Sequence, residues 1–119
     1  MNKLLTTMFA LAVACVTAVS HAQEVKGDAK AGEKKIAMCI GCHGIKGYQA
    51  SFPEIYRVPM ISGQGAKYIV SALNAYATGE RKHPSMRGIS ESLTEQDKAD
   101  LAAFYEGHGK AGAAPAPAA

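Results

Sequence analysis

The amino-acid sequence predicts a single small all-α domain with long loops. Apolar residues recur at helical spacing in two segments, Ala66 to Thr78 and Thr94 to Gly107, and no segment alternates apolar with polar residues as a half-buried strand does. Start and stop signals flank both segments. The chain of 119 residues suffices for one domain, which we expect over residues 23–109.

The first helix is expected to begin after Asp28, whose carboxylate is a good N-cap, and to run from Ala29 to Met38. Gly32 is unfavourable inside this helix by about 1 kcal/mol relative to alanine. A glycine nevertheless suits a position where another helix crosses closely. Residues 44–58 break the helical pattern and predict a loop that carries several apolar side chains.

Two further helices are expected downstream. The apolar stripe of the segment 66–78 is followed by Gly79, a typical residue for ending a helix. Residues 80–92 predict a basic loop that contains Met86. Thr94, with Asp97 three residues later, resembles a capping box that opens the last helix, and Gly107 is expected to end it.

The first 22 residues have the features of a secretory signal peptide: Lys3, then an apolar stretch at 4–19 and a small-x-small cleavage site at 20–22. The apolar stretch is shorter than the roughly 20 residues that a membrane-spanning helix needs. The residues before Cys15 are a poor match to a lipoprotein signal. We therefore expect cleavage after residue 22, a periplasmic location and no membrane span in the mature protein.

Composition and charge exclude several classes of function. The net charge of +3 is modest and indicates no nucleic-acid partner. We recognise no paired carboxylates, no nucleophile with a base and no phosphate-binding loop, so no independent enzymatic centre is expected. After Lys110 the chain contains only alanine, glycine and proline, which predicts a disordered tail at residues 110–119.

Cys39, Cys42 and His43 form the motif C-x-x-C-H, which is the attachment signature of a c-type haem. The two thiols can add across the haem vinyl groups while the adjacent imidazole reaches the iron. A structural zinc site, a redox-active dithiol and a plain disulfide are the alternatives. Zinc would need a fourth ligand, and no second Cys/His pair lies at finger spacing. A dithiol of the thioredoxin type would lie near a βαβ pattern, which the sequence lacks.

A second axial ligand to the iron could be Met86, Met60 or His83, since thioether sulfur and imidazole both bind haem iron. Position in the sequence separates them once a family resemblance is considered. The chain resembles the class I cytochromes c, specifically bacterial periplasmic monohaem members that look like one half of the dihaem carriers. The resemblance covers residues 28–106 and rests on residues 39–44, 58–64, 68, 79–81, 86–88 and 93–105.

This resemblance implies about three to four helices wrapped around one covalently attached haem c, with the first and last helices crossed. Cys39 and Cys42 would form the thioethers, and His43 and Met86 would be the axial iron ligands. The carbonyl of Pro59 would accept a hydrogen bond from His43 and orient its ring. Contacts to the haem propionates or the pocket would come from Tyr48, Tyr56, Arg57 and Gln64.

The resemblance further implies a one-electron carrier of the periplasm and not an enzyme. Two other functions are retained: a haem c subunit of a periplasmic oxidoreductase, for example one oxidising sulfur compounds, and a five-coordinate gas-binding haem protein. The partners of a carrier would be redox proteins. Basic residues could form a rim around the haem edge that attracts acidic partners: Lys46, Arg57, Lys67, Arg81, Lys82 and Arg87.

Overall fold

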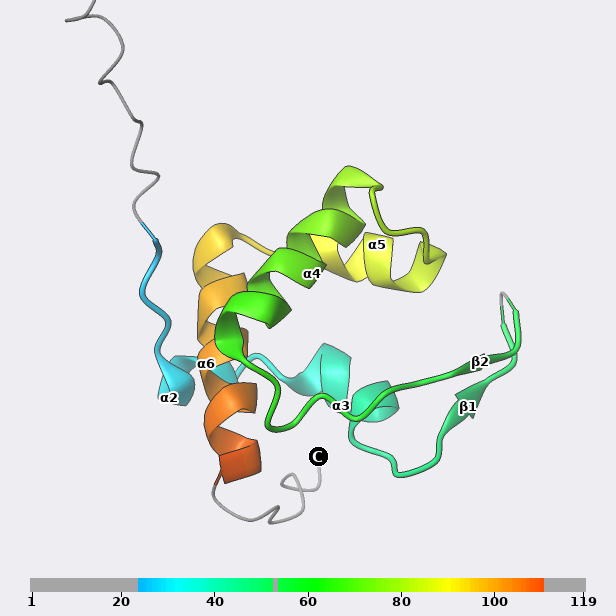
Figure 1. The fold of residues 1–119 in the computed structure, drawn as a ribbon, viewed down its shortest axis with the longest axis horizontal. Helices are drawn as coiled ribbons and strands as arrows, with labels where there is room; N and C mark the ends of the chain where they lie inside the picture. The colour runs from blue at the N-terminus through cyan, green and yellow to red at the C-terminus, as the bar shows by residue number, and fades with distance from the viewer. Residues whose placement is uncertain (1–23, 53, 111–119) are drawn as a thin grey trace, which may run out of the picture.

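The computed structural model describes residues 24–52 and 54–110 (Figure 1). Along the chain the elements are α2 (Ala29–Glu33), α3 (Ala37–His43), β1 (Gln49–Ala50), β2 (Tyr56–Arg57), α4 (Ala66–Thr78), α5 (Pro84–Glu91) and α6 (Glu95–Lys110). The expected signal peptide and the residues of the expected tail beyond 110 lie outside the described residues. Within them, no helix is long and apolar enough to cross a membrane. The all-α prediction is confirmed.

The first predicted helix is two helices. Asp28 caps α2 as expected, because its Oδ1 accepts a hydrogen bond from the Lys30 amide at 2.8 Å. The helix then ends at Glu33 instead of continuing to Met38. The Lys35 amide donates to the Gly32 carbonyl at 2.8 Å. Donor and acceptor are three residues apart, as in a 3₁₀ turn, and not four as in an α-helix. This turn redirects the chain, so that Ile36 enters the core before α3 begins.

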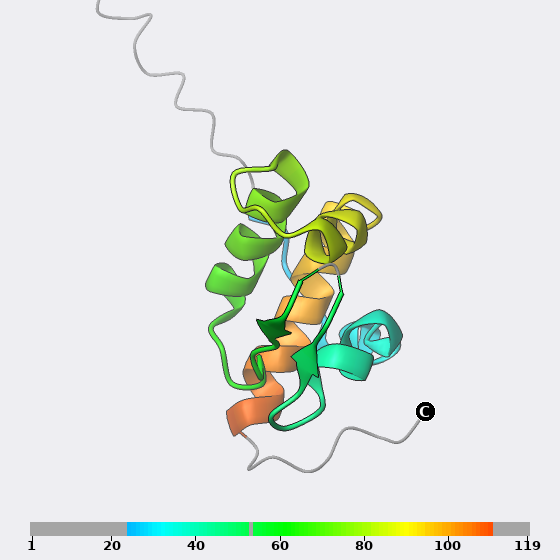
Figure 2. The same ribbon diagram turned by 90° about the vertical axis from the view of Figure 1, so that its right-hand side faces the viewer.

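The helices α2 and α6 cross at close range, as the resemblance implied (Figures 1 and 2). A Cβ atom at Gly32 would overlap the backbone carbonyl of Asp100 and lie 2.9 Å from Cβ of Phe104. Glycine is therefore required by the contact itself, and this outweighs its low helix propensity. The expected role of Gly32 at a helix crossing is confirmed.

A polar cluster ties the same crossing together. The Asp100 carboxylate is buried, and it accepts hydrogen bonds from the Asp28 amide at 2.8 Å and from Lys35 Nζ at 2.7 Å. Lys35 Nζ also lies 2.7 Å from Asp97 Oδ1. These bonds to Lys35 lower the pKa of both carboxyl groups and raise the pKa of the lysine. The cluster holds the N-terminal segment on α6.

Helix α4 has the predicted bounds and ends at Gly79, which adopts the left-handed conformation with φ of 84°. The predicted loop at 80–92 is wrong, because Pro84–Glu91 form α5. Pro84 stands in the first turn, where proline is favoured, and the His83 ring caps the helix by accepting from the Met86 amide at 3.4 Å. Histidine is not a usual N-cap residue, which hid this start from sequence reasoning.

The capping box of the last helix is confirmed. Thr94 Oγ1 donates to Asp97 Oδ2 at 2.6 Å and accepts from the Asp97 amide at 3.1 Å. Gly107 does not end the helix, which continues to Lys110. The last turns are held because the Gly63 amide donates to the Tyr105 carbonyl at 2.8 Å, a contact that offsets the cost of an exposed glycine.

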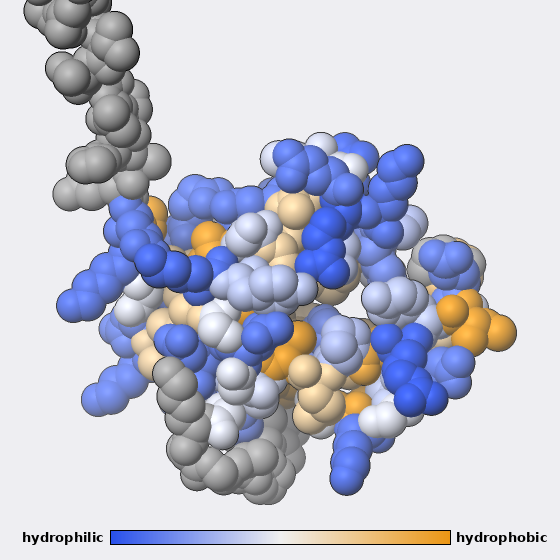
Figure 3. Space-filling view, viewed as in Figure 1, coloured by the Kyte–Doolittle hydropathy of each residue, from blue (hydrophilic) through white to orange (hydrophobic). Residues whose placement is uncertain are grey.

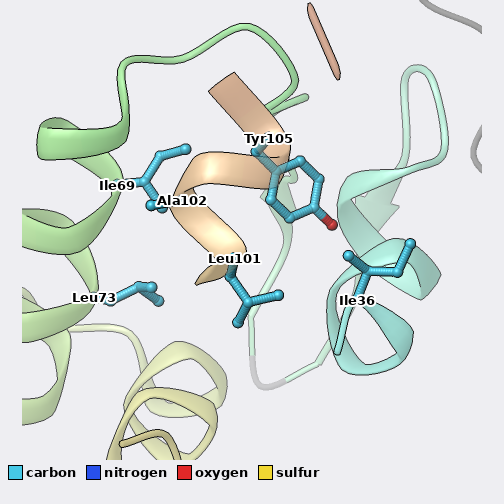
Figure 4. Close-up of a cluster of buried hydrophobic side chains, with 6 residues drawn as sticks. All are labelled: Ile36, Ile69, Leu73, Leu101, Ala102 and Tyr105. Carbon is cyan, nitrogen blue, oxygen red and sulfur yellow. The ribbon is translucent and has the colours of Figure 1, made fainter. Parts of the chain in front are cut away.

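The core lies between α4, α6 and the start of α3 (Figure 4). Six buried side chains form it: Ile36, Ile69, Leu73, Leu101, Ala102 and Tyr105. The expected loop at 44–58 contains an antiparallel pair of two-residue strands, with Gln49 opposite Arg57 and Ala50 opposite Tyr56. This hairpin stands out from the helices (Figure 1). The sequence showed no strand signal there, because so short a pair leaves no periodicity to detect.

Candidate functional site

Helix α3 presents its cysteine and histidine side chains to a cavity of about 340 Å³. The walls come from α3, the segment 48–64, α4, α5 and Leu101 of α6. Figure 3 shows apolar side chains gathered around this hollow between the helices and the hairpin. Cavities of this size lined mainly by apolar groups are typical ligand sites.

The three motif residues share one face of α3. Cys42 lies three positions after Cys39, and His43 lies four positions after it, so helical geometry places them on neighbouring parts of one face. Both cysteines are free thiols, and all three side chains line the cavity. Burial raises the pKa of the Cys39 thiol, which is half-buried, whereas Cys42 is exposed.

The His43 ring is held from the side of residues 58–61. Its Nδ1 lies 2.7 Å from the carbonyl oxygen of Pro59. Since a carbonyl can only accept, Nδ1 carries the proton in this contact. The Nε2 of the neutral ring therefore keeps its lone pair, the state required of an imidazole that binds a metal.

The three candidates for a second ligand have different surroundings. Met86 reaches the cavity from α5, where its half-buried side chain packs against the core cluster. Met60 is 50% exposed and follows Pro59, so it belongs to the segment that holds His43. The His83 ring is engaged as the N-cap of α5 and in an edge contact with Tyr56, with ring centroids 4.9 Å apart.

The other expected pocket residues are partly brought together. Tyr48, Tyr56 and Gln64 line the cavity. Arg57 is not among the lining residues, and it lies exposed on β2. Successive side chains of a strand point to opposite sides, and on β2 it is Tyr56 that lines the cavity. A contact of Arg57 with a haem propionate stays a prediction.

The cavity includes residues that sequence reasoning assigned to packing or to the surface. Tyr76 and Arg81 both line it, and the Arg81 guanidinium lies 4.6 Å from the centre of the Tyr76 ring. Arg81 also donates to the Tyr68 hydroxyl at 3.4 Å. Tyr68 and Tyr76 are eight residues apart in the segment 66–78, so helical spacing places them on one face, and this is the sequence signal that could have found Tyr76. Arg81 follows the helix and has no such signal.

The lining fits a large flat apolar group with two attachment points. Phe52 and Met60 line the cavity yet are 86% and 50% exposed, so its wall offers apolar surface that the protein itself does not cover. Two thiols and an imidazole stand on the same wall. This donor set and surface match a covalently bound haem.

The alternatives for the motif find less support. Among the described residues, no three His, Cys, Asp or Glu side chains are grouped so as to hold a metal ion, which argues against the zinc site. The strands described are one antiparallel pair, and a thioredoxin-like βαβ unit needs parallel strands. Haem attachment uses all three residues and, unlike a zinc site, needs no fourth Cys or His ligand beside them.

The expected basic rim is only partly assembled. Arg81 borders the cavity, and Lys82 follows it in the chain. Lys67 lines a separate depression, where it lies 3.4 Å from Glu24, and Arg87 is paired with Glu91 at 2.7 Å. The acidic residues of α6 are largely neutralised as well, because Lys35 and Lys98 bind them. Several of the charged residues are thus paired within the molecule.

Comparison with known proteins agrees with this site. Residues 29–107 match the family described as Cytochrome c. Cytochrome c-554(548) of Halomonas halodenitrificans is 44% identical over 82 residues, which are 66% of this chain and 94% of that protein. Cytochrome c4 of Pseudomonas aeruginosa is 36% identical over 105 residues, 88% of this chain but 48% of that protein.

A further relative, from Stutzerimonas stutzeri, is named thiosulfate dehydrogenase electron acceptor and is 31% identical over 85 residues, 67% of this chain and 37% of that protein. The chain spans about half the length of the cytochrome c4 relatives. The family match covers most of the chain, and the alignment with cytochrome c-554(548) covers nearly the whole of that protein. The chain belongs to the cytochrome c family, whose members are electron-transfer proteins with a covalently attached haem c.

Proposed function

We propose that this protein is a periplasmic one-electron carrier, with Cys39 and Cys42 as the thioether anchors of its haem and His43 and Met86 as axial ligands. The observation that carries the proposal is the joint placement of these four side chains on one apolar cavity. The periplasmic location rests on the signal features of residues 1–22.

His43 is prepared for its role by the contact with Pro59. The 2.7 Å bond at Nδ1 fixes the ring and leaves Nε2 free to bind iron. Met86 is preferred over Met60 because it would bind the iron from a wall of the cavity other than the one that holds His43. Met60 shares the segment of Pro59 on the His43 side, whereas Met86 comes from α5.

The haem supplies reversible one-electron chemistry at its iron, and the residues decide how that chemistry is used. Met86 would close the sixth position, so that exogenous ligands are excluded. Methionine ligation and an apolar pocket both favour the reduced state and raise the potential. Arg81 at the cavity border would attract acidic partners, with Lys82 and the exposed Arg57 adding positive charge nearby.

The visible spectrum of the ferric protein tests the ligand assignment. Sulfur coordination of ferric haem gives a weak long-wavelength band, which we expect in the wild type and expect to vanish in Met86→Ala. Met60→Ala is the matched control, since it removes a methionine from the same cavity and should keep the band. A band lost in Met60→Ala but kept in Met86→Ala would overturn the assignment. Ready binding of carbon monoxide by the reduced, ferrous wild type at neutral pH would instead support an open site.

A role as electron acceptor of a periplasmic dehydrogenase is a second candidate. It is favoured by the relative named thiosulfate dehydrogenase electron acceptor. Reduction of the ferric protein by a purified sulfur-compound dehydrogenase plus its substrate would support this role. If the rate equals that of a substrate-free control, the protein does not accept electrons from that enzyme.

A further inference from the structure

The Tyr105 side chain has an unexplained polar atom in the core. Tyr105 is 4% exposed, and its hydroxyl is one of two buried side-chain polar atoms without a hydrogen-bond partner in the described part of the chain; the other is Ser90 Oγ. Phenylalanine would fill the same space without this unpaired group. A buried hydroxyl without a partner is unfavourable, so its presence calls for a reason.

The hydroxyl faces the segment that carries the haem motif. In Figure 4 the Tyr105 oxygen points away from α6 toward the start of α3, beside Ile36. Cys39 packs against the core cluster to which Tyr105 belongs. The two groups act on each other: the hydroxyl lowers the pKa of the Cys39 thiol against the larger effect of burial, and Cys39 adds to the rise that burial causes in the Tyr105 pKa.

Attachment of haem changes what Cys39 can do. When a thiol adds across a vinyl group, the S–H bond is replaced by an S–C bond, and the hydrogen goes to the other vinyl carbon. The sulfur can then accept a hydrogen bond but no longer donate one. The neighbouring group must be a donor, and tyrosine supplies an O–H.

We propose that the Tyr105 hydroxyl donates a hydrogen bond to the Cys39 thioether sulfur, which makes Tyr105 a positioning residue for the haem. This inference rests on the proposed function, because it takes Cys39 as an attachment site. The bond would fix one edge of the haem against α6. It would also aim the positive end of an O–H dipole at the haem edge, which favours the reduced state.

Tyr105→Phe tests the proposal in the haem-loaded protein. We expect the ratio of reduced to oxidised protein at a fixed ambient potential to fall about threefold, which corresponds to a midpoint about 28 mV lower, since tenfold is 59 mV for one electron. Ser90→Ala is the matched control, because it removes the other unpaired buried hydroxyl, which does not line the cavity. Its midpoint should equal that of the wild type.

Proton NMR of the reduced wild type provides the direct readout. A hydroxyl buried against the thioether should give a slowly exchanging proton with a cross-relaxation peak to the thioether protons of Cys39, and Tyr105→Phe should lack it. An unchanged midpoint together with a missing hydroxyl signal would overturn this proposal. If the long-wavelength band and covalent haem are present in that sample, the proposed function still stands. If covalent haem is absent from the wild type, the proposed function fails first.

Discussion

Replacement of Gly32 by alanine is the most informative perturbation of the fold, because two opposed effects of known size meet there. In an open helix this change stabilises by up to about 1 kcal/mol. At Gly32 the new methyl group would overlap the Asp100 carbonyl and lie 2.9 Å from Phe104 Cβ. Neither neighbour is the flexible end of a side chain, so α2 itself must move.

The cost of that movement exceeds the gain in propensity. Overpacking of a tight contact costs roughly 1–3 kcal/mol. Withdrawal of α2 also stretches the bonds of Asp100 to the Asp28 amide and to Lys35, each worth on the order of 1 kcal/mol. We therefore expect Gly32→Ala to lower the free energy of unfolding by about 2 kcal/mol.

Guanidinium unfolding of the haem-loaded protein, followed by far-ultraviolet circular dichroism, measures this difference. Gly107→Ala is the matched control, because Gly107 lies inside α6 and nothing stands within 4 Å of a Cβ built there. The control should be as stable as the wild type or more stable. If Gly32→Ala were equally stabilising, the close crossing of α2 and α6 would be refuted.

Three further predictions follow from named contacts. Because Lys35 lowers the pKa of Asp97 and Asp100, their contribution to stability is complete above the unfolded value near 3.9 and is lost as the pH falls through the lower folded values. The stability difference between wild type and Lys35→Met, measured by urea unfolding, should therefore shrink below about pH 4; a constant difference would contradict this. Gly79→Ala should cost about 1–2 kcal/mol, because φ at this position is 84°, and thermal unfolding reports it. The double variant Cys39→Ser/Cys42→Ser should lack covalent haem and show a weaker helical signal, since the cavity's apolar wall would be left facing water; wild-type helicity and cooperative unfolding would argue against this.

The sequence predicted those helices whose start or end has a local chemical signal. Asp28, Gly79 and the Thr94–Asp97 pair each act on the backbone within three residues, and each was located correctly. The break after Glu33 has no such local signal. It depends on distant contacts, because it brings Ile36 into the core and Lys35 to Asp100. Helix α5 was missed because its cap is the His83 ring and Gly88 lies inside it.

The candidate site follows the same rule. Cys39, Cys42 and His43 are recognisable because they lie within five residues of one another and form the C-x-x-C-H motif, which indicates attachment of a c-type haem. The partner of His43 is 16 residues away, and its carbonyl has no side-chain signature, so Pro59 came from family resemblance alone. The hydroxyl of Tyr105 could not be foreseen at all, because its position beside Cys39 depends on how α6 packs.

Helix α6 connects the stability of the fold to the cofactor. Asp100 and Phe104 face α2, whereas Leu101 lines the cavity and Tyr105 packs in the cluster next to Cys39. These pairs are one position apart, so they occupy adjacent faces of the same helix, about 100° from each other. The position of α6 therefore determines both the shape of the cavity wall and the place where α2 packs. A change that destabilises the contact between α2 and α6 should accordingly also weaken the packing of the protein against the haem, and a change that stabilises the contact should strengthen it.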